Sequence, residues 1–209
     1  MKPTFTHLIL RKAYNAMKNK LILASASPRR LELLKQIDIV PDEVLPADIN
    51  ETPLEREKPK DMALRLAIGK AEKIRKEHTD SFILAADSTV ACGRKLLDKA
   101  ESQEQAVEYI AKLSGRRHHV YGGICLITPS GKVLTRQSDT LVQFKPLSAE
   151  EKSRYIASGE WEGKAGGYGI QGMAGAFVKY MAGSYSNVVG LSLYDTMKIL
   201  EGGHFLKTT

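Results

Sequence analysis

The sequence predicts an α/β protein with a single mixed-sheet domain. Short apolar runs typical of buried strands alternate with segments whose apolar residues recur at helical spacing. Two long strand-like segments, residues 118–128 and 132–144, are joined by Pro-Ser-Gly, which places an antiparallel pair in the middle of the sheet. Because no repeat, low-complexity tract or linker divides the sequence, we expect residues 21–209 to form one domain, bilobed around a central cleft.

Composition is that of an ordinary globular protein, with 43% hydrophobic and 26% charged residues. The net charge of +7 favours anionic partners but does not choose between nucleotide, nucleic acid and membrane surface. Cys92 and Cys125 lie far apart without metal-binding spacing, which argues against a zinc site or a disulfide scaffold. Their scarcity fits a reducing compartment, and no apolar run approaches the ~18–20 residues of a membrane span, so we expect a cytoplasmic protein.

Residues 1–20 contain several bases and no acid. They lack the serine richness and arginine bias of a transit peptide, and their apolar run is too short for a secretory signal. We interpret this stretch as an N-terminal extension or a misplaced start, with a targeting signal as the alternative.

The first strand and helix carry an unusual charge pattern. The apolar residues 21–24 predict a strand, Ser27 suits a helix N-cap, and Pro28 suits the first helical position. Arg29 and Arg30 then place two cations in the first turn, where each costs about 0.3–1 kcal/mol. Either a bound phosphate compensates, with serines, backbone N–H groups and both guanidiniums converging on it, or both arginines point into water.

Further along the sequence, four charged residues lie in or beside the predicted elements. A short strand over 43–45 leads into a loop with Glu51, although acids in loops are usually just solvated, and residues 58–78 predict a long surface helix with Lys70 in its middle. Residues 82–87 predict a buried strand ending at Asp87, and strand ends open into the crevice of an α/β sheet. Ser88 follows, and a hairpin turning at residues 93–94 ends its second strand at Lys99.

The remaining elements are predicted from caps and glycines. Ser102 with Gln105, and Ser148 with Glu151, form capping-box patterns for helices over 104–113 and up to residue 157, and a last helix over 194–200 ends at two glycines. Residues 164–175 contain G-x-G-x-x-G but lack the flanking strand and helix of a dinucleotide site. This loop either lets backbone approach a ligand or simply turns tightly.

His118 and His119 are neighbours on a predicted strand, so their side chains face opposite ways and cannot share one metal. We assign them structural or surface roles.

Taken together, these segments resemble the Maf family of nucleoside triphosphate pyrophosphatases. The match extends from residue 21 to about residue 201, and the pair S-P-R-R and Y-G-I-Q-G resembles the subgroup that acts on dTTP and UTP. The motifs occur in family order: S-A-S-P-R-R (25–30), I-N-E (49–51), A-A-D-S (85–88), L-D-K (97–99), S-G-R-x-H-x-V-Y (114–121), K-A-G-G-Y-G-I-Q-G (164–172) and G-S-Y-S-N-V-V-G-L (183–191).

The resemblance implies a Maf or ITPase-like fold that hydrolyses a nucleoside triphosphate between the α- and β-phosphates, using a divalent cation, Mg²⁺ or Mn²⁺. It also implies house-cleaning of nucleotide pools, a homodimer and no stable nucleic-acid partner. By position, Asp87 is similar to the family's proton acceptor, and the other catalytic positions are matched by Glu51, Lys70 and Lys99. Positions associated with substrate choice are matched by Arg29, Ser88 and Gln171.

The expected chemistry agrees with these residue types. Bases such as Arg29, Arg30, Lys70 and Lys99 would neutralise the leaving pyrophosphate, and Ser27 lies beside them. Glu51 and Asp87 are the nearest oxygen ligands for a hard cation, and one carboxylate must orient or deprotonate water. Which carboxylate has which role stays open. Gln171 has both a donor and an acceptor for the edge of a pyrimidine.

Three positions depart from the family pattern. Ser88 stands where threonine is usual, which keeps the hydroxyl and loses a methyl group, L-D-K-A replaces L-x-K-P, and G-L-S replaces G-L-P.

Two alternatives are a basic nucleic-acid-binding protein and a non-catalytic regulator of cell division. The first would use Arg29, Arg30, Arg116 and Arg117, but few aromatic residues lie near these bases. The second is disfavoured because every candidate catalytic residue is retained.

Overall fold

The structure is a computed structural model that describes residues 20–206. The expected N-terminal extension therefore lies almost wholly outside the described residues. The elements are β1 (Leu21–Ala24), α2 (Pro28–Lys35), β2 (Glu43–Val44), α3 (Pro59–Arg75), β3 (Phe82–Cys92), β4 (Lys95–Leu97), α4 (Gln103–Leu113), β5 (Arg117–Ile127), β6 (Val133–Phe144), α5 (Ala149–Ala157), a 3₁₀ helix (Met173–Phe177), β7 (Val178–Ala182), α6 (Tyr185–Val189) and α7 (Leu193–Gly202).

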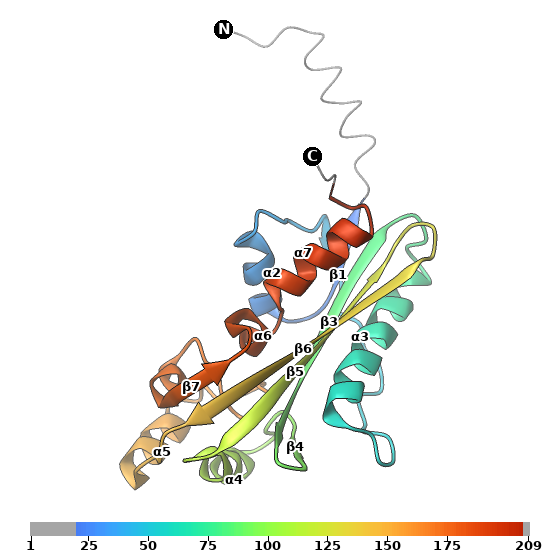
Figure 1. Ribbon diagram of the computed structural model, residues 1–209. Coiled ribbons are helices and arrows are strands. Elements are labelled where there is room, and N and C mark those ends of the chain that lie inside the picture. The colour runs from blue at the N-terminus through green and yellow to red at the C-terminus, as the bar shows by residue number, and fades with distance from the viewer. Residues whose placement is uncertain (1–19, 207–209) are drawn as a thin grey trace, which may run out of the picture.

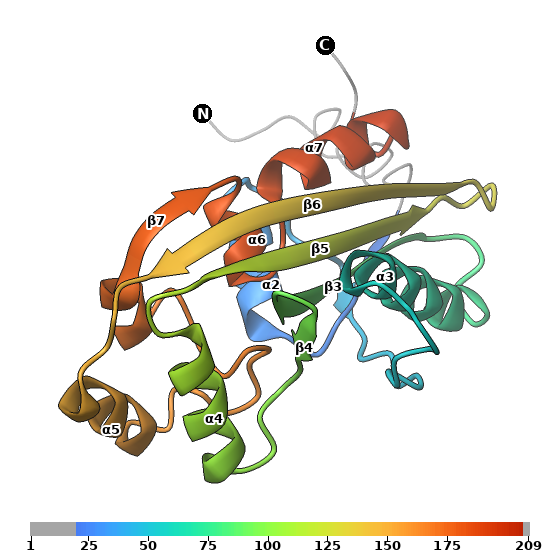
Figure 2. The ribbon, with the colours of Figure 1, turned by 60° about the horizontal axis from the view of Figure 1, so that its bottom comes forward.

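A mixed sheet forms the centre of the molecule, as predicted. Its strand order is β2-β1-β3-β5-β6-β7, with β4 paired to β3. The β2–β1–β3 pairs are parallel, and the pairs from β3 to β7 are antiparallel. Figures 1 and 2 show α3 on one face of the sheet and α2, α6 and α7 on the other, while α4 and α5 lie at one end of β5 and β6. The long strands β5 and β6 thus join two lobes.

The apolar run of β1 is explained by helices on both faces of the sheet. Leu21 and Leu23 belong to the larger core with residues of α2 and α7, whereas Ile22 and Ala24 pack with residues of α3. All four side chains are fully buried. A strand covered on both faces reads as a continuous apolar run rather than an alternating one.

The long strand β3 is paired on both edges except in its middle. β1 pairs with its first part, Phe82–Ala85, and β4 pairs with its last part, Val90–Cys92. Between them, Ala86–Thr89 pair only with β5 among the strands of the described chain. This short free edge is where the candidate site forms.

Two glycines of β5 lie opposite this part of β3. A Cβ at Gly123 would lie 2.3 Å from the carbonyl oxygen of Ala63 in α3, and a Cβ at Gly122 would lie 2.0 Å from Oδ1 of Asn187 in α6. The Asn187 amide donates to the carbonyl of Val120 at 2.9 Å. Glycine is needed at both positions because a side chain would push α3 and α6 away from the sheet.

The structure corrects several expected boundaries. The strand expected to end at Asp87 continues for five more residues, because β5 and then β4 supply hydrogen-bonding partners. Lys99 lies beyond β4 and forms only an isolated bridge with Ala165. The helix α6 was not predicted, and a 3₁₀ helix precedes β7.

The two capping predictions differ in outcome. Ser148 and Glu151 form a complete capping box at α5, as predicted. At α4, Ser102 accepts from the N–H of Gln105, but the Gln105 side chain accepts from the N–H of Glu101 instead of closing the box.

The adjacent histidines face opposite ways, as predicted. His118 is fully buried, with Nε2 2.8 Å from the hydroxyl of Tyr168, and its Nδ1 has no partner among the described residues. His119 instead pairs with Asp139 at the surface. Burial lowers the pKa of His118 to about 4, so it is neutral at pH 7.

This burial predicts an acid-sensitive contribution to stability. The unfolded chain takes up a proton on His118 near pH 6.5 and the folded chain only near pH 4, so stability is present above pH 6.5 and lost as pH falls. We expect wild-type protein to lose about 2–3 kcal/mol more free energy of unfolding than His118→Phe between pH 7 and pH 4.5, measured by urea unfolding. Equal losses in the two proteins would contradict the assignment.

Candidate active site

A pocket of about 860 Å³ opens at the free edge of β3. The loop before α2, the loop before α3, α3 itself, β3 and the glycine-rich loop after α5 all contribute to its wall. All the residues predicted for the site line this one pocket: Ser27, Arg29, Arg30, Glu51, Lys70, Asp87, Ser88, Lys99 and Gln171. The topology explains the convergence, because Asp87 and Ser88 are successive in β3 and point to opposite faces around an edge left open between β1 and β4.

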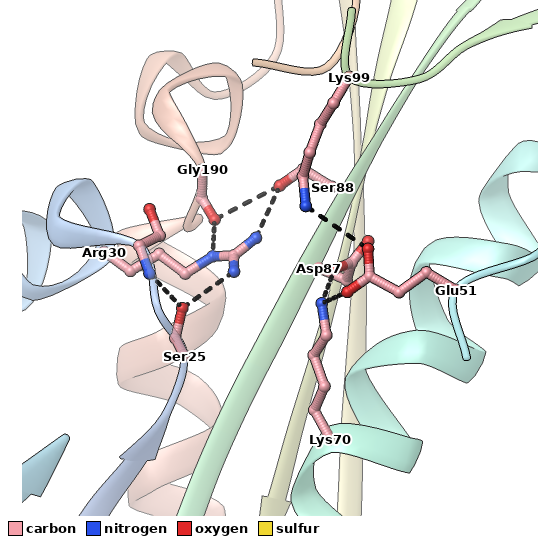
Figure 3. Close-up of polar contacts among 9 residues, drawn as sticks. Ser25, Arg30, Glu51, Lys70, Asp87, Ser88, Lys99 and Gly190 are labelled. Atoms are coloured by element: carbon pink, nitrogen blue, oxygen red, sulfur yellow. Dashed lines mark hydrogen bonds and ion pairs between the residues drawn. The ribbon is translucent and has the colours of Figure 1, made fainter. Parts of the chain in front are cut away.

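Lys70 lies between the two candidate carboxylates (Figure 3). Its Nζ is 2.5 Å from Oδ1 of Asp87 and 2.6 Å from Oε1 of Glu51, and Nζ of Lys99 lies 3.5 Å from Oε2 of Glu51. Lys70 and Asp87 are each only 8% exposed. Removing Lys70 would leave the buried Asp87 without its ion-pair partner, so the cluster holds α3, β3 and the Glu51 loop in register.

The ionisation of the acids follows from this arrangement. Burial alone raises the pKa of Glu51, but the hydrogen bonds and positive charges of Lys70 and Lys99 outweigh burial and lower it overall. Glu51 is therefore a carboxylate at neutral pH. Asp98 also lines the pocket, and burial together with the negative charges of Asp87 and Glu51 raises its pKa.

Arg30 is held by the protein itself. Its Nε donates to the carbonyl of Gly190 at 2.9 Å, its Nη1 to Oγ of Ser25 at 3.1 Å, and its Nη2 to Oγ of Ser88 at 3.5 Å (Figure 3). Burial lowers its pKa, although the charge of Asp87 opposes the shift. The guanidinium ties α2 to β3 and to the end of α6, so Arg30 and Arg29 differ in how the protein holds them. Three of the five N–H donors of Arg30 are used in this way.

Arg29 differs from its neighbour. It lines the pocket, its side chain makes no hydrogen bond or ion pair with any described residue, and burial lowers its pKa. Ser27 occupies the N-cap position as predicted, but its side chain makes no capping bond, and its N–H donates to Oγ of Ser25 at 3.2 Å. The N–H of Arg30 donates to the carbonyl of Ser27 at 3.2 Å, so backbone rather than the Ser27 side chain closes the first turn of α2.

Three of the polar pocket residues that sequence reasoning missed are Ser25, Asp98 and Lys164. Ser25 is buried, and its Oγ accepts hydrogen bonds from the Arg30 guanidinium and from the N–H of Ser27. Asp98 and Lys164 also contribute to the wall. All three lie within motifs already noted, and the signal available for Lys164 was its place at the start of the glycine-rich segment.

The acids present fit a hard divalent cation only in part. Among residues 20–206 there is no group of three or more His, Cys, Asp or Glu side chains placed to hold a metal. Glu51 and Asp87 nevertheless approach the same ammonium of Lys70, which brings their oxygens close together. Mg²⁺ commonly takes one or two carboxylates and completes its shell with water and substrate phosphates, so this pair suffices.

The different roles of the two arginines can be separated by substitution. We expect Arg30→Lys to lower the free energy of unfolding by about 1–3 kcal/mol, because lysine cannot replace three directed hydrogen bonds and leaves buried acceptors unpaired. The matched Arg29→Lys variant should stay within about 0.5 kcal/mol of wild type. Urea unfolding of both variants tests this, and equal stability of the two would contradict the anchoring role of Arg30.

Comparison with known proteins places the chain in a family. Residues 20–202, which include every candidate site residue, match the family described as Maf-like protein. A dTTP/UTP pyrophosphatase from Mesorhizobium japonicum is 55% identical over 192 residues, covering 89% of this chain and 92% of that protein. The corresponding protein from Agrobacterium fabrum is 52% identical over 198 residues, covering 92% and 96%.

Among solved structures, the Staphylococcus aureus Ham1 protein aligns with a TM-score of 0.44 and 20% identity, over 60% of this chain and 72% of that one. The family match spans the whole folded unit and its pocket, and the curated relatives match it over nearly their full length. The chain belongs to the Maf family.

Proposed function

We propose that the protein hydrolyses dTTP and UTP between the α- and β-phosphates, giving the monophosphate and pyrophosphate as a house-cleaning step for nucleotide pools. The observation that carries this proposal is the convergence of Glu51, Asp87 and Lys70 with Arg29 in one pocket. The relatives named dTTP/UTP pyrophosphatase, more than 50% identical, support the same substrates.

The cluster supplies the groups that this hydrolysis needs. One of the carboxylates, Glu51 or Asp87, orients the attacking water and accepts its proton. Lys70 and Lys99 neutralise the charge that develops on the leaving pyrophosphate. Because Lys70 is almost fully buried, its charge acts at short range with little screening by water.

A divalent cation, Mg²⁺ or Mn²⁺, is part of this proposal. Glu51 and Asp87 would hold it together with water and phosphate oxygens. When bound, it supplies further neutralisation of the phosphate charge.

Substrate choice is proposed for Arg29, Ser88 and Gln171, with Arg29 also binding phosphate. Gln171 lies on the glycine-rich loop at the pocket, where its amide offers a donor and an acceptor to a pyrimidine edge. The hydroxyl of Ser88 is oriented by Arg30 and by the carbonyl of Gly190, 3.4 Å away. A fixed hydroxyl discriminates between bases better than a freely rotating one.

We further propose a cytoplasmic homodimer without a stable nucleic-acid partner. Both cysteines are free and buried, which suits a reducing compartment. Across residues 20–206, none of the helices has the length and apolar character needed to cross a membrane. The four arginines that a nucleic-acid-binding protein would use do not share one site. Arg29 and Arg30 line the pocket, whereas Arg116 and Arg117 do not.

The decisive assay measures pyrophosphate and orthophosphate released from dTTP, UTP and other nucleotides with Mg²⁺ or Mn²⁺. We expect pyrophosphate from dTTP and UTP, and a loss of kcat of about 10²–10⁴-fold in Asp87→Asn, because the amide can neither accept a proton nor replace a carboxylate as a cation ligand. Asp139→Asn, which alters a surface pair outside the pocket, should keep wild-type activity. Intact triphosphate, or orthophosphate as the first product, would refute the proposal.

A further inference from the structure

Lys164 is a base of the pocket that the roles described so far do not use. It begins the glycine-rich segment and lines the pocket wall together with Gly169 and Gln171. We propose that Lys164 is a substrate-binding residue that, together with Arg29, receives the negative charge of the triphosphate. The inference rests on the proposed function in one respect, the identity of the anion as a phosphate chain.

The pocket contains two kinds of cation. Lys70 and Lys99 form ion pairs with Glu51 and, for Lys70, also with Asp87. Lys164, by contrast, forms no ion pair with any described residue and donates to two neutral acceptors, the carbonyls of Glu160 at 2.5 Å and Glu162 at 3.5 Å. Carbonyl oxygens orient an ammonium but do not cancel its charge.

Arg29 faces the same situation. It makes no contact of its own with an acid in the described chain, and its positive charge acts on Lys164. Burial and then the charge of Arg29 lower the pKa of Lys164, and the negative charges of Glu160 and Glu162 only partly oppose this shift. Two partly buried cations that line the same pocket and repel each other are both stabilised when an anion binds there.

The lysine is held in place by the backbone beside it. A Cβ at Gly169 would lie 2.8 Å from Cε and 2.9 Å from Cδ of Lys164, so the absence of a side chain there gives the lysine stem its path along the loop. The carboxylate of Glu160 is already used, because it accepts from the N–H of Met173 at 2.8 Å. The Lys164 ammonium therefore keeps its charge, and at least one of its three N–H donors, for a ligand.

Inorganic tripolyphosphate is the probe of choice, because it carries the phosphate chain without a base or sugar. We expect Lys164→Met to weaken tripolyphosphate binding about 10- to 100-fold by calorimetry, through loss of a charge-assisted hydrogen bond. Methionine preserves the stem against Gly169. Lys164→Arg should stay within about threefold of wild type, because it keeps the charge. The control Lys132→Met removes an exposed lysine outside the pocket and should leave binding within about twofold.

Three results would overturn the inference. These are wild-type protein that does not bind tripolyphosphate, Lys164→Met that binds it like wild type, and equal losses in the Met and Arg variants with a lowered melting temperature. The last would mean that Lys164 only holds the loop. Hydrolysis of dTTP and UTP by wild-type protein is measured separately, so failure of the enzymatic proposal is distinguished from failure of this inference.

Discussion

The buried ammonium of Lys70 imposes the strongest constraint on this structure. A lysine this deeply buried is stable only when carboxylates compensate it, and both Glu51 and Asp87 do so at hydrogen-bonding distance. The helix α3 must therefore lie close against β3 and β5, and glycine at position 123 makes that approach sterically possible. The same contact that stabilises the fold thus gathers the acids that the proposed reaction needs.

The second constraint is the division of β3 between two partners. β1 and β4 each pair with one end of the strand along the same edge. Between them, the middle of β3 has no neighbouring strand on that edge. Asp87 turns toward α3 and Ser88 toward α2 and α6, and each meets its own network. The pocket therefore joins two differently charged surfaces, a paired acid–lysine cluster and an arginine-rich helix start.

Local periodicity was sufficient to predict the mixed sheet and the helix that carries Lys70. The family motifs gave nine residues that line the pocket, but not Ser25, Asp98 or Lys164. The sequence could not predict what Arg30 contacts, since its main partner is the carbonyl of Gly190, 160 positions along the chain. The end of the strand at Asp87 was wrong for a related reason. A polar residue signals a strand end locally, whereas β5 supplies hydrogen bonds well beyond it and Lys70 compensates the charge.

The unfavourable charges of two arginines in the first turn of a helix can be compensated by a bound anion or by solvent. In the structure the two arginines have different surroundings. Arg30 is compensated by the dipole of the Gly190 carbonyl and by two hydroxyls, so the protein itself offsets the unfavourable charge. Arg29 has no such partner in the described chain and is only partly exposed, so neither the protein nor full hydration satisfies it. In the proposed complex, the phosphates of the substrate neutralise the charges of Arg29 and Lys164.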